Sequence, residues 1–156
     1  MDRGVQVALI ALAALGGFAA FFSLILLVLS LVGGWRALAQ RYRTDRPYQG
    51  AIWKYQFGFL GAVRYNGALT VGSGMEGFYL AVFPLFRPFH PPLLIPWSEV
   101  AVGRRKQALW MQLVELRLGP EPVASLWVAD ALARQIASAP GACLRGAEIS
   151  GSSSRA

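Results

Sequence analysis

The densest run of positive charge in the second half of the chain is Arg104-Arg105-Lys106. Three consecutive cations in a turn can bind phosphate, whether it belongs to a lipid headgroup or to a nucleic acid. The segment Gly103–Gln107 is predicted to be such a turn. The alternative is a solvated hairpin tip whose charge only keeps the protein soluble. Arg104, Arg105 and Lys106 are therefore candidate phosphate or lipid contacts.

Side chains suited to catalysis are scarce. His90 is the only histidine and Cys143 the only cysteine, so the ligands of a structural zinc site are lacking. Ser98 follows His90 without a Gly-x-Ser-x-Gly motif, and His90 lies in a proline-rich loop, which favours a structural role. The acidic residues are well separated in sequence. We predict no catalytic residue, no metal and no cofactor, with an enzyme subunit whose acidic site is assembled by folding as the alternative.

The net charge of +7 comes from 15 Lys and Arg residues against 8 Asp and Glu residues. Much of it follows an apolar N-terminal segment, where Asp45 is the only acid among five basic residues. These are Arg36, Arg41, Arg43, Arg46 and Lys54. Their position beside the apolar segment favours an anionic membrane over a nucleic acid as the partner. A membrane-tethered nucleic-acid binder is a further alternative.

The apolar segment predicts a membrane anchor. No charged residue occurs from Gly4 to Trp35, and a transmembrane helix needs about 20 apolar residues to cross about 30 Å of hydrocarbon. A transmembrane helix is therefore predicted over 5–32, long enough to tilt or protrude. A cleaved signal peptide competes with it, because Ala37-Leu38-Ala39 resembles a cleavage site. Arg36, between the apolar segment and that site, favours the anchor.

The charge distribution predicts the orientation of this helix. Asp2 and Arg3 nearly cancel before it, whereas the basic residues gather after it. The positive-inside rule therefore places the N-terminus outside the plasma (inner) membrane and the following domain in the cytoplasm. Small residues at Ala13 and Gly17 have the spacing of a helix–helix contact, although such residues are common in membrane helices. A protein partner or a homo-oligomer is thus a candidate as well.

Residues 35–46 are predicted to form a juxtamembrane amphipathic helix, since Trp35, Leu38 and Tyr42 share one face. Two interpretations of this helix stay open. In the first, it lies at the level of the lipid headgroups. In the second, it packs on the domain and its arginines are solvated. In the first interpretation the interface residues are Trp35, Arg36, Arg41 and Arg43.

After Pro47 the hydrophobic pattern changes from helical to alternating. Trp53, Tyr55, Phe57 and Phe59 alternate with other residues and are predicted to form one core face of a strand. Further strands are predicted over 63–72, 78–83, 97–102, 108–118 and 123–128, with a short edge strand at 93–95 in a proline-rich loop.

Asp130 is a predicted N-cap of a last helix, which Pro140-Gly141 ends. Residues 140–156 are rich in Gly and Ser and are predicted to be disordered. Residues 50–139 are thus predicted to be an α+β, mainly β domain: an antiparallel β-barrel or sandwich of six to seven strands with a C-terminal capping helix.

The order of these elements resembles the pleckstrin-homology (PH)-like superfold, and in particular bacterial PH-like or GRAM-like domains of unknown function. The resemblance covers roughly residues 50–139 and rests on Gly77–Leu80, on Pro96, Trp97, Glu99 and Val100, and on the helix from Asp130. It implies a role in lipid or protein binding without catalytic residues. The predicted function is a single-pass membrane-anchored binding or scaffolding protein whose cytoplasmic domain contacts a protein partner, anionic lipid or both.

Overall fold

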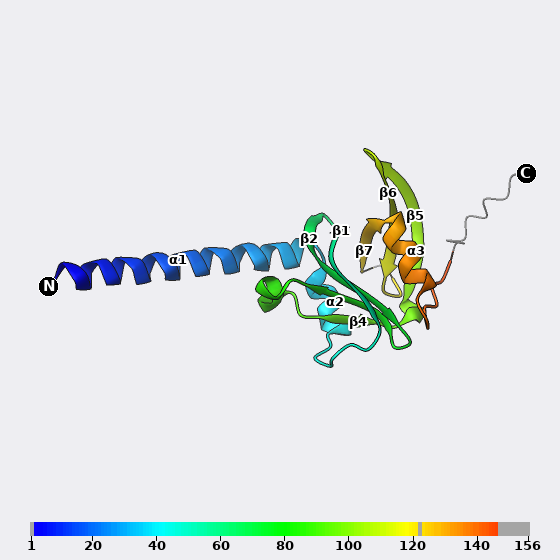
Figure 1. The fold of residues 1–156 in the computed structure, drawn as a ribbon, viewed down its shortest axis with the longest axis horizontal. Coiled ribbons are helices and arrows are strands. Elements are labelled where there is room, and N and C mark those ends of the chain that lie inside the picture. Colours follow the sequence, from blue (N-terminus) through cyan, green and yellow to red (C-terminus); the bar gives the residue numbers. More distant parts are fainter. Residues whose placement is uncertain (1, 122, 147–156) are drawn as a thin grey trace, which may run out of the picture.

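A long helix extends away from a compact β domain (Figure 1). The computed structural model describes residues 2–121 and 123–146. The helices are α1 (Arg3–Val32), α2 (Trp35–Tyr42) and α3 (Asp130–Ser138), with 3-10 helices η1 (Pro84–Phe89) and η2 (Trp97–Glu99). The strands are β1 (Ala51–Leu60), β2 (Val63–Gly74), β3 (Gly77–Val82), β4 (Leu93–Ile95), β5 (Val100–Ala108), β6 (Met111–Leu118) and β7 (Ala124–Ala129).

The seven strands form one antiparallel sheet in the order β4-β3-β2-β1-β7-β6-β5. The sheet curls into a half-barrel, and α3 lies against it (Figure 1). Each neighbouring pair is joined by antiparallel ladder hydrogen bonds, so β4 and β5 are the two edges. The predicted α+β, mainly β class with a C-terminal helix is confirmed.

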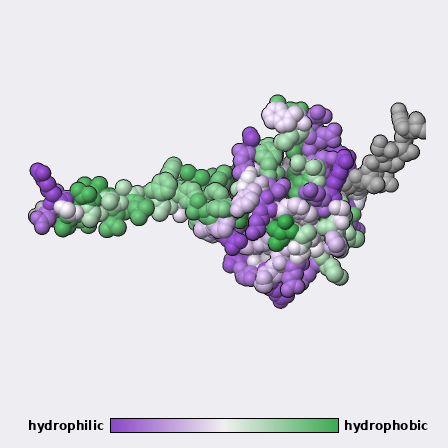
Figure 2. Space-filling view, in the orientation of Figure 1, coloured by the Kyte–Doolittle hydropathy of each residue, from purple (hydrophilic) through white to green (hydrophobic). Residues whose placement is uncertain are grey.

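α1 is the one helix in the described part of the chain that is long and apolar enough to cross a membrane. Most of its side chains are exposed, and its apolar surface continues from the N-terminus to the domain (Figure 2). Its 30 residues measure about 45 Å, which exceeds the hydrocarbon thickness by about 15 Å. Leu26 and Ser30, in the surplus last turns, are buried against the domain. The extra length is therefore used for packing.

α2 belongs to the domain core. The chain turns from α1 into α2 at Gly33 and Gly34, and Gly34 has a φ of +77°. A Cβ at Gly33 would lie 3.2 Å from the Val63 side chain, so the turn between α1 and α2 packs directly against the β1–β2 turn. Trp35 and Leu38 are fully buried. The observed helix is shorter than the predicted one, because it ends at Tyr42 and not at residue 46.

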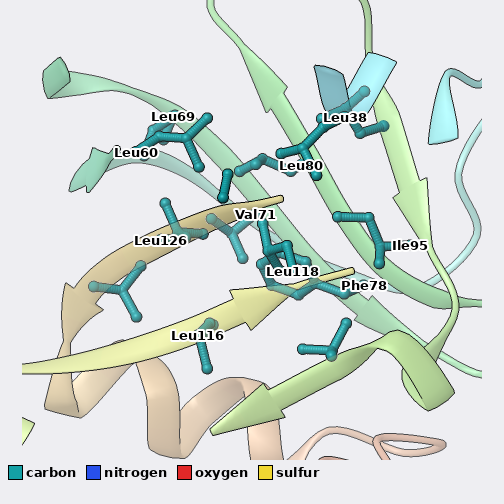
Figure 3. Packing of buried hydrophobic residues seen from close by; sticks show 14 of the residues in the cluster. Leu38, Leu60, Leu69, Val71, Phe78, Leu80, Ile95, Leu116, Leu118 and Leu126 are labelled. Carbon is teal, nitrogen blue, oxygen red and sulfur yellow. The ribbon is translucent and has the colours of Figure 1, made fainter. Parts of the chain in front are cut away.

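The core lies inside the curl of the sheet and consists mainly of aliphatic side chains, with Trp35, Phe78 and Trp97 among its aromatic members (Figure 3). Leu69 and Leu80 come from the first strands, Leu116 and Leu126 from the last ones, and all four are fully buried. Ile136 of α3 belongs to the same cluster. The labelled residues in Figure 3 are Leu38, Leu60, Leu69, Val71, Phe78, Leu80, Ile95, Leu116, Leu118 and Leu126.

The predicted core row of aromatic residues in β1 is wrong. β1 has register shifts between Trp53 and Gln56, and Tyr55 there has a positive φ of 58°. A shift of one residue reverses the face of every following side chain. Trp53 therefore packs against the core, Tyr55 is exposed, and the neighbouring rings of Phe57 and Phe59 are half-buried on the other face.

The predicted turn over 103–107 is also wrong. These residues belong to β5, and the chain reverses at Leu109 and Trp110, where Leu109 has a φ of 54°. Both tip side chains are more than four-fifths exposed, at 84% and 82%. The strand predicted over 97–102 begins only at Val100, because residues 97–99 form η2.

The C-terminal part also differs from expectation. Asp130 is the first residue of α3, preceded by the N-cap Ala129, and makes no capping hydrogen bond. Residues 140–146 do not leave the domain as a disordered tail, because Arg145 pairs with Ala101 at the start of β5. The rest of the predicted tail, 147–156, lies outside the described residues.

Candidate functional site

The junction between α1 and the domain is held by the proline-rich loop that contains η1. The hydroxyl of Ser30 donates a 2.8 Å hydrogen bond to the carbonyl of Phe89. The indole N–H of Trp35 donates a 3.0 Å hydrogen bond to the carbonyl of Pro91. These contacts join residues more than 50 positions apart, so the last turns of α1 are fixed to the domain.

A buried polar pair lies behind this junction. Nε2 of His90 is 3.1 Å from the hydroxyl of Tyr65, and the His90 ring meets the Trp35 ring edge-on at 5.2 Å. Only 1% of His90 is exposed. Burial lowers the pKa of His90 and raises that of Tyr65, so both side chains are neutral at pH 7. The predicted structural role of His90 agrees with this packing.

A cavity of about 180 Å³ opens beside the last turns of α1. Its lining is mainly apolar and comes from α1, β2 and η1. The lining residues are Leu26, Leu29, Val63, Arg64, Tyr65, Asn66, Ala68, Phe86 and His90. Nδ1 of His90 is buried and has no hydrogen-bond partner within the described residues. An apolar pocket with one unused polar atom is typical of a ligand site.

A second, more polar groove of about 260 Å³ adjoins this cavity, because Ala68 lines both. Lys54 and Arg87 line the groove, together with Tyr79 and Thr70. Among the residues that the structure describes, no acidic side chain lines either space. The two spaces together offer an apolar compartment beside α1 and a cationic compartment next to it.

Arg36 and Arg43 line a third groove, next to Phe89 and the end of α1. Arg36 and Arg41 are exposed, as is Arg43, which pairs with Asp45 at 3.6 Å. The interface interpretation is wrong for Trp35, whose side chain is fully buried in the domain core. The α2 helix therefore packs on the domain and leaves its arginines exposed.

Two of the three predicted phosphate contacts, Arg105 and Lys106, line one shallow groove with Gln107 and Gln112, whereas Arg104 does not line it. Arg104 lies 3.6 Å from Glu115, whereas Arg105 lies 3.8 Å from Asp130. Lys106 lies over the Trp127 ring at 4.7 Å. Each cation in β5 thus has a partner of its own. Because β5 is a sheet edge, these charges also oppose strand pairing with another chain.

Glu115 is the centre of the polar network under β5. Its carboxylate accepts hydrogen bonds from the Arg104 backbone N–H at 3.1 Å and from the Ser125 hydroxyl at 2.8 Å. Arg117 lies 3.5 Å away. Burial alone would raise the pKa of Glu115, but these hydrogen bonds and guanidinium groups lower it below its usual value. The β5–β6 pairing has a register shift between Val102 and Arg105, and the Glu115 network lies beside this bulge and ties up the carboxylate.

Three residues of this junction were not predicted from sequence: Tyr65, Arg64 and Arg87. Arg64 and Arg87 each stand alone in sequence and reach the junction only through the fold. The only feature of the sequence that could have pointed to this junction was the apolar, proline-rich segment around Arg87. In the described parts of the chain, no group of three or more His, Cys, Asp or Glu side chains is arranged to hold a metal ion.

No protein-family model, characterised protein or solved structure shows significant similarity to this chain. The fold and the junction therefore carry the functional argument.

Proposed function

We propose that this chain is a single-pass membrane protein whose β domain binds anionic lipid at the membrane surface, without catalysis. The observation that carries the proposal is the fixed junction between α1 and the domain. Because Ser30 and Trp35 are hydrogen-bonded to the η1 loop, the same end of the domain always faces the membrane that α1 enters. Arg36, Arg64 and Arg87 lie at that end, where cations meet anionic headgroups.

The core supports an anchor that is not cleaved. Cleavage after Ala39 would remove Trp35 and Leu38, which are both fully buried. Burying such side chains stabilises a domain by about 2 kcal/mol each. We also propose that the domain is cytoplasmic, at the plasma membrane, because the basic residues follow α1.

The PH-like resemblance belongs to the same proposal. Seven antiparallel strands followed by a covering helix support it. A contact with a protein partner is the second candidate function, and the observation that favours it is the β5–β6 hairpin tip. Leu109 and Trp110 project there with more than four-fifths of each side chain exposed. Large exposed apolar side chains in a group commonly mark an interaction surface.

The native cysteine allows a direct test of anchor and orientation. Cys143 is exposed and is the only cysteine in the chain. In cells that express the full chain, a membrane-impermeant maleimide should label Cys143 only after permeabilisation. In the matched control, Asp2→Cys combined with Cys143→Ser, the reagent should label intact cells.

Alkaline carbonate and N-terminal sequencing complete this test. The protein should stay in the membrane fraction after carbonate washing, and its sequence should begin before Ala39. Release by carbonate, or a mature N-terminus at Gln40, would refute the anchor. Labelling of Cys143 in intact cells would refute the orientation alone.

A further inference from the structure

We propose that the cavity beside α1 and the adjoining groove bind one anionic glycerophospholipid taken from the leaflet next to the domain. The first carbons of one acyl chain occupy the apolar cavity, and the phosphate lies between Arg64 and the groove that Lys54 and Arg87 line. This inference rests on the proposed membrane anchor and names the lipid site within it.

The position of the cavity selects an acyl chain as its occupant. Leu26 and Leu29 line it from α1, and Phe86 lines it from η1. About 20 residues of α1 suffice to cross the hydrocarbon, so a helix that enters near Arg3 leaves it shortly before Leu26. The cavity mouth therefore lies at the boundary between acyl chains and headgroups. A chain from the leaflet can cover its apolar lining without crossing water.

Neighbouring side chains extend this apolar region. Phe83 and Leu85 are 42% and 59% exposed. The Phe22 ring of α1 lies tilted against the Phe86 ring, with 6.2 Å between the ring centroids. In Figure 1 the η1 segment lies alongside the domain end of α1, on the side that faces the N-terminus. These side chains can contact the same leaflet that supplies the chain.

His90 offers a hydrogen-bond donor to the lipid, which a plain hydrocarbon could not accept but an ester carbonyl could. His90 is only 1% exposed and lines the cavity. The backbone of Phe86 lies near its ring, but Nδ1 makes no hydrogen bond of normal geometry within the described residues. In the tautomer in which Tyr65 donates to Nε2, Nδ1 carries a proton and can donate to an ester carbonyl. Glycerophospholipids carry ester carbonyls at the start of each acyl chain, and His90 lines the cavity in which that chain would begin.

The charges near the cavity favour an anionic headgroup. The guanidinium of Arg64 is held at the rim by the Phe57 ring at 5.2 Å and by the side-chain carbonyl of Asn66 at 2.9 Å. Lys54 and Arg87 line the adjoining groove, and no carboxylate from the described part of the chain lines either space. A phosphate placed there can form charge-assisted hydrogen bonds without a competing anion.

The test is photocrosslinking of the full chain in nanodiscs. The probe is phosphatidylglycerol with a diazirine in one acyl chain, and the comparison arm uses phosphatidylcholine with the same chain. Cross-linked residues are mapped by mass spectrometry. We expect two sets of labelled residues: exposed positions of α1 from 5 to 24, which report the anchor, and residues 63–68 with Phe86, which report the pocket.

Two variants with matched controls separate site binding from general membrane contact. Ala68→Trp fills the space that both compartments share and should abolish labelling of 63–68, whereas Ala131→Trp, on the exposed face of α3, should not. Arg64→Gln should remove the preference for phosphatidylglycerol, expected to be about tenfold or about 1.4 kcal/mol. Arg134→Gln removes the same charge elsewhere and should keep that preference.

Each outcome bears on one proposal. Labelling of α1 without labelling of residues 63–68 would overturn the lipid site and leave the anchor standing. Equal labelling by both lipids would overturn the assignment of the cations to a phosphate. Absence of labelling along α1 would overturn the proposed anchor itself. The melting temperature of Ala68→Trp shows whether the variant is folded, and Arg64→Gln tests the site independently of it.

Discussion

The hydroxyl of Tyr65 in β2 lies 3.1 Å from Nε2 of His90 in the proline-rich loop, and both side chains are buried. The pair joins the sheet to the loop that holds the end of α1. Because a neutral histidine is required in this setting, the stability of the junction depends on pH.

The first prediction concerns His90. Burial lowers its pKa below the ordinary value of 6.5, so the unfolded chain binds a proton more readily than the folded one. The stability contributed by neutral His90 is therefore complete above about pH 6.5 and falls as the pH drops below it. Thermal unfolding followed between pH 7.5 and 5 should show this fall. In His90→Gln, which does not titrate, the fall should disappear, and an unchanged pH profile would contradict the prediction.

The second prediction concerns Glu115, whose pKa is lowered. The direction is the same as for His90, but at lower pH: the carboxylate stabilises the folded state above about pH 4.5, and this contribution is lost as the pH falls further. Glu115→Ala leaves the Arg104 N–H and the Ser125 hydroxyl without their acceptor and should cost about 2 kcal/mol at pH 7. Glu121→Ala, at an exposed position, should cost less than about 0.5 kcal/mol in the same denaturation assay. Equal costs would refute the network.

The third prediction compares two tryptophans. Trp35→Ala should destabilise the protein by about 3–5 kcal/mol, because the indole is fully buried and donates to Pro91. Trp110→Ala should change stability by less than about 0.5 kcal/mol, because that ring is 82% exposed. Chemical denaturation in one detergent measures both. If Trp35→Ala were as stable as Trp110→Ala, α2 would not belong to the core.

The fourth prediction compares two glycines with positive φ. At Gly77, with φ of +144°, a Cβ would collide with the carbonyl oxygen of Ile95 in β4. At Gly67, with φ of +63°, the nearest atom would be 3.9 Å away. Gly67→Ala should therefore cost only about 1 kcal/mol of backbone strain. Gly77→Ala should cost clearly more, since the β3–β4 ladder must shift. Equal melting temperatures of the two variants would argue against the β3–β4 pairing.

The fold class and the succession of elements could be predicted from periodicity. Apolar residues without any charge over 5–32 predict a long apolar helix suited to crossing a membrane, and alternation with frequent turns predicts a mainly β domain. Periodicity could not predict which side chains of β1 face the core. The register shifts at Tyr55 depend on pairing with β2, and no local pattern reports which residue a partner strand will skip.

The candidate site shows the same division. Arg104, Arg105 and Lys106 stand out in sequence because they are adjacent, but adjacency in a strand directs side chains to opposite faces and to different partners. Arg64, Arg87 and His90 are separated by up to 26 positions, and the packing of η1 against α1 and β2 is what gathers them.

The sequence by itself determined the apolar helix, the basic residues that follow it and the mainly β character of the domain, because these depend on composition and on short-range periodicity. Only the tertiary structure decided that Trp35 belongs to the core, that the last turns of α1 are fixed to the η1 loop, and that a cavity opens there. The physical reason is that burial and cavities arise from contacts between distant segments, such as Ser30 with Phe89, and their free energy is set by the packed chain as a whole.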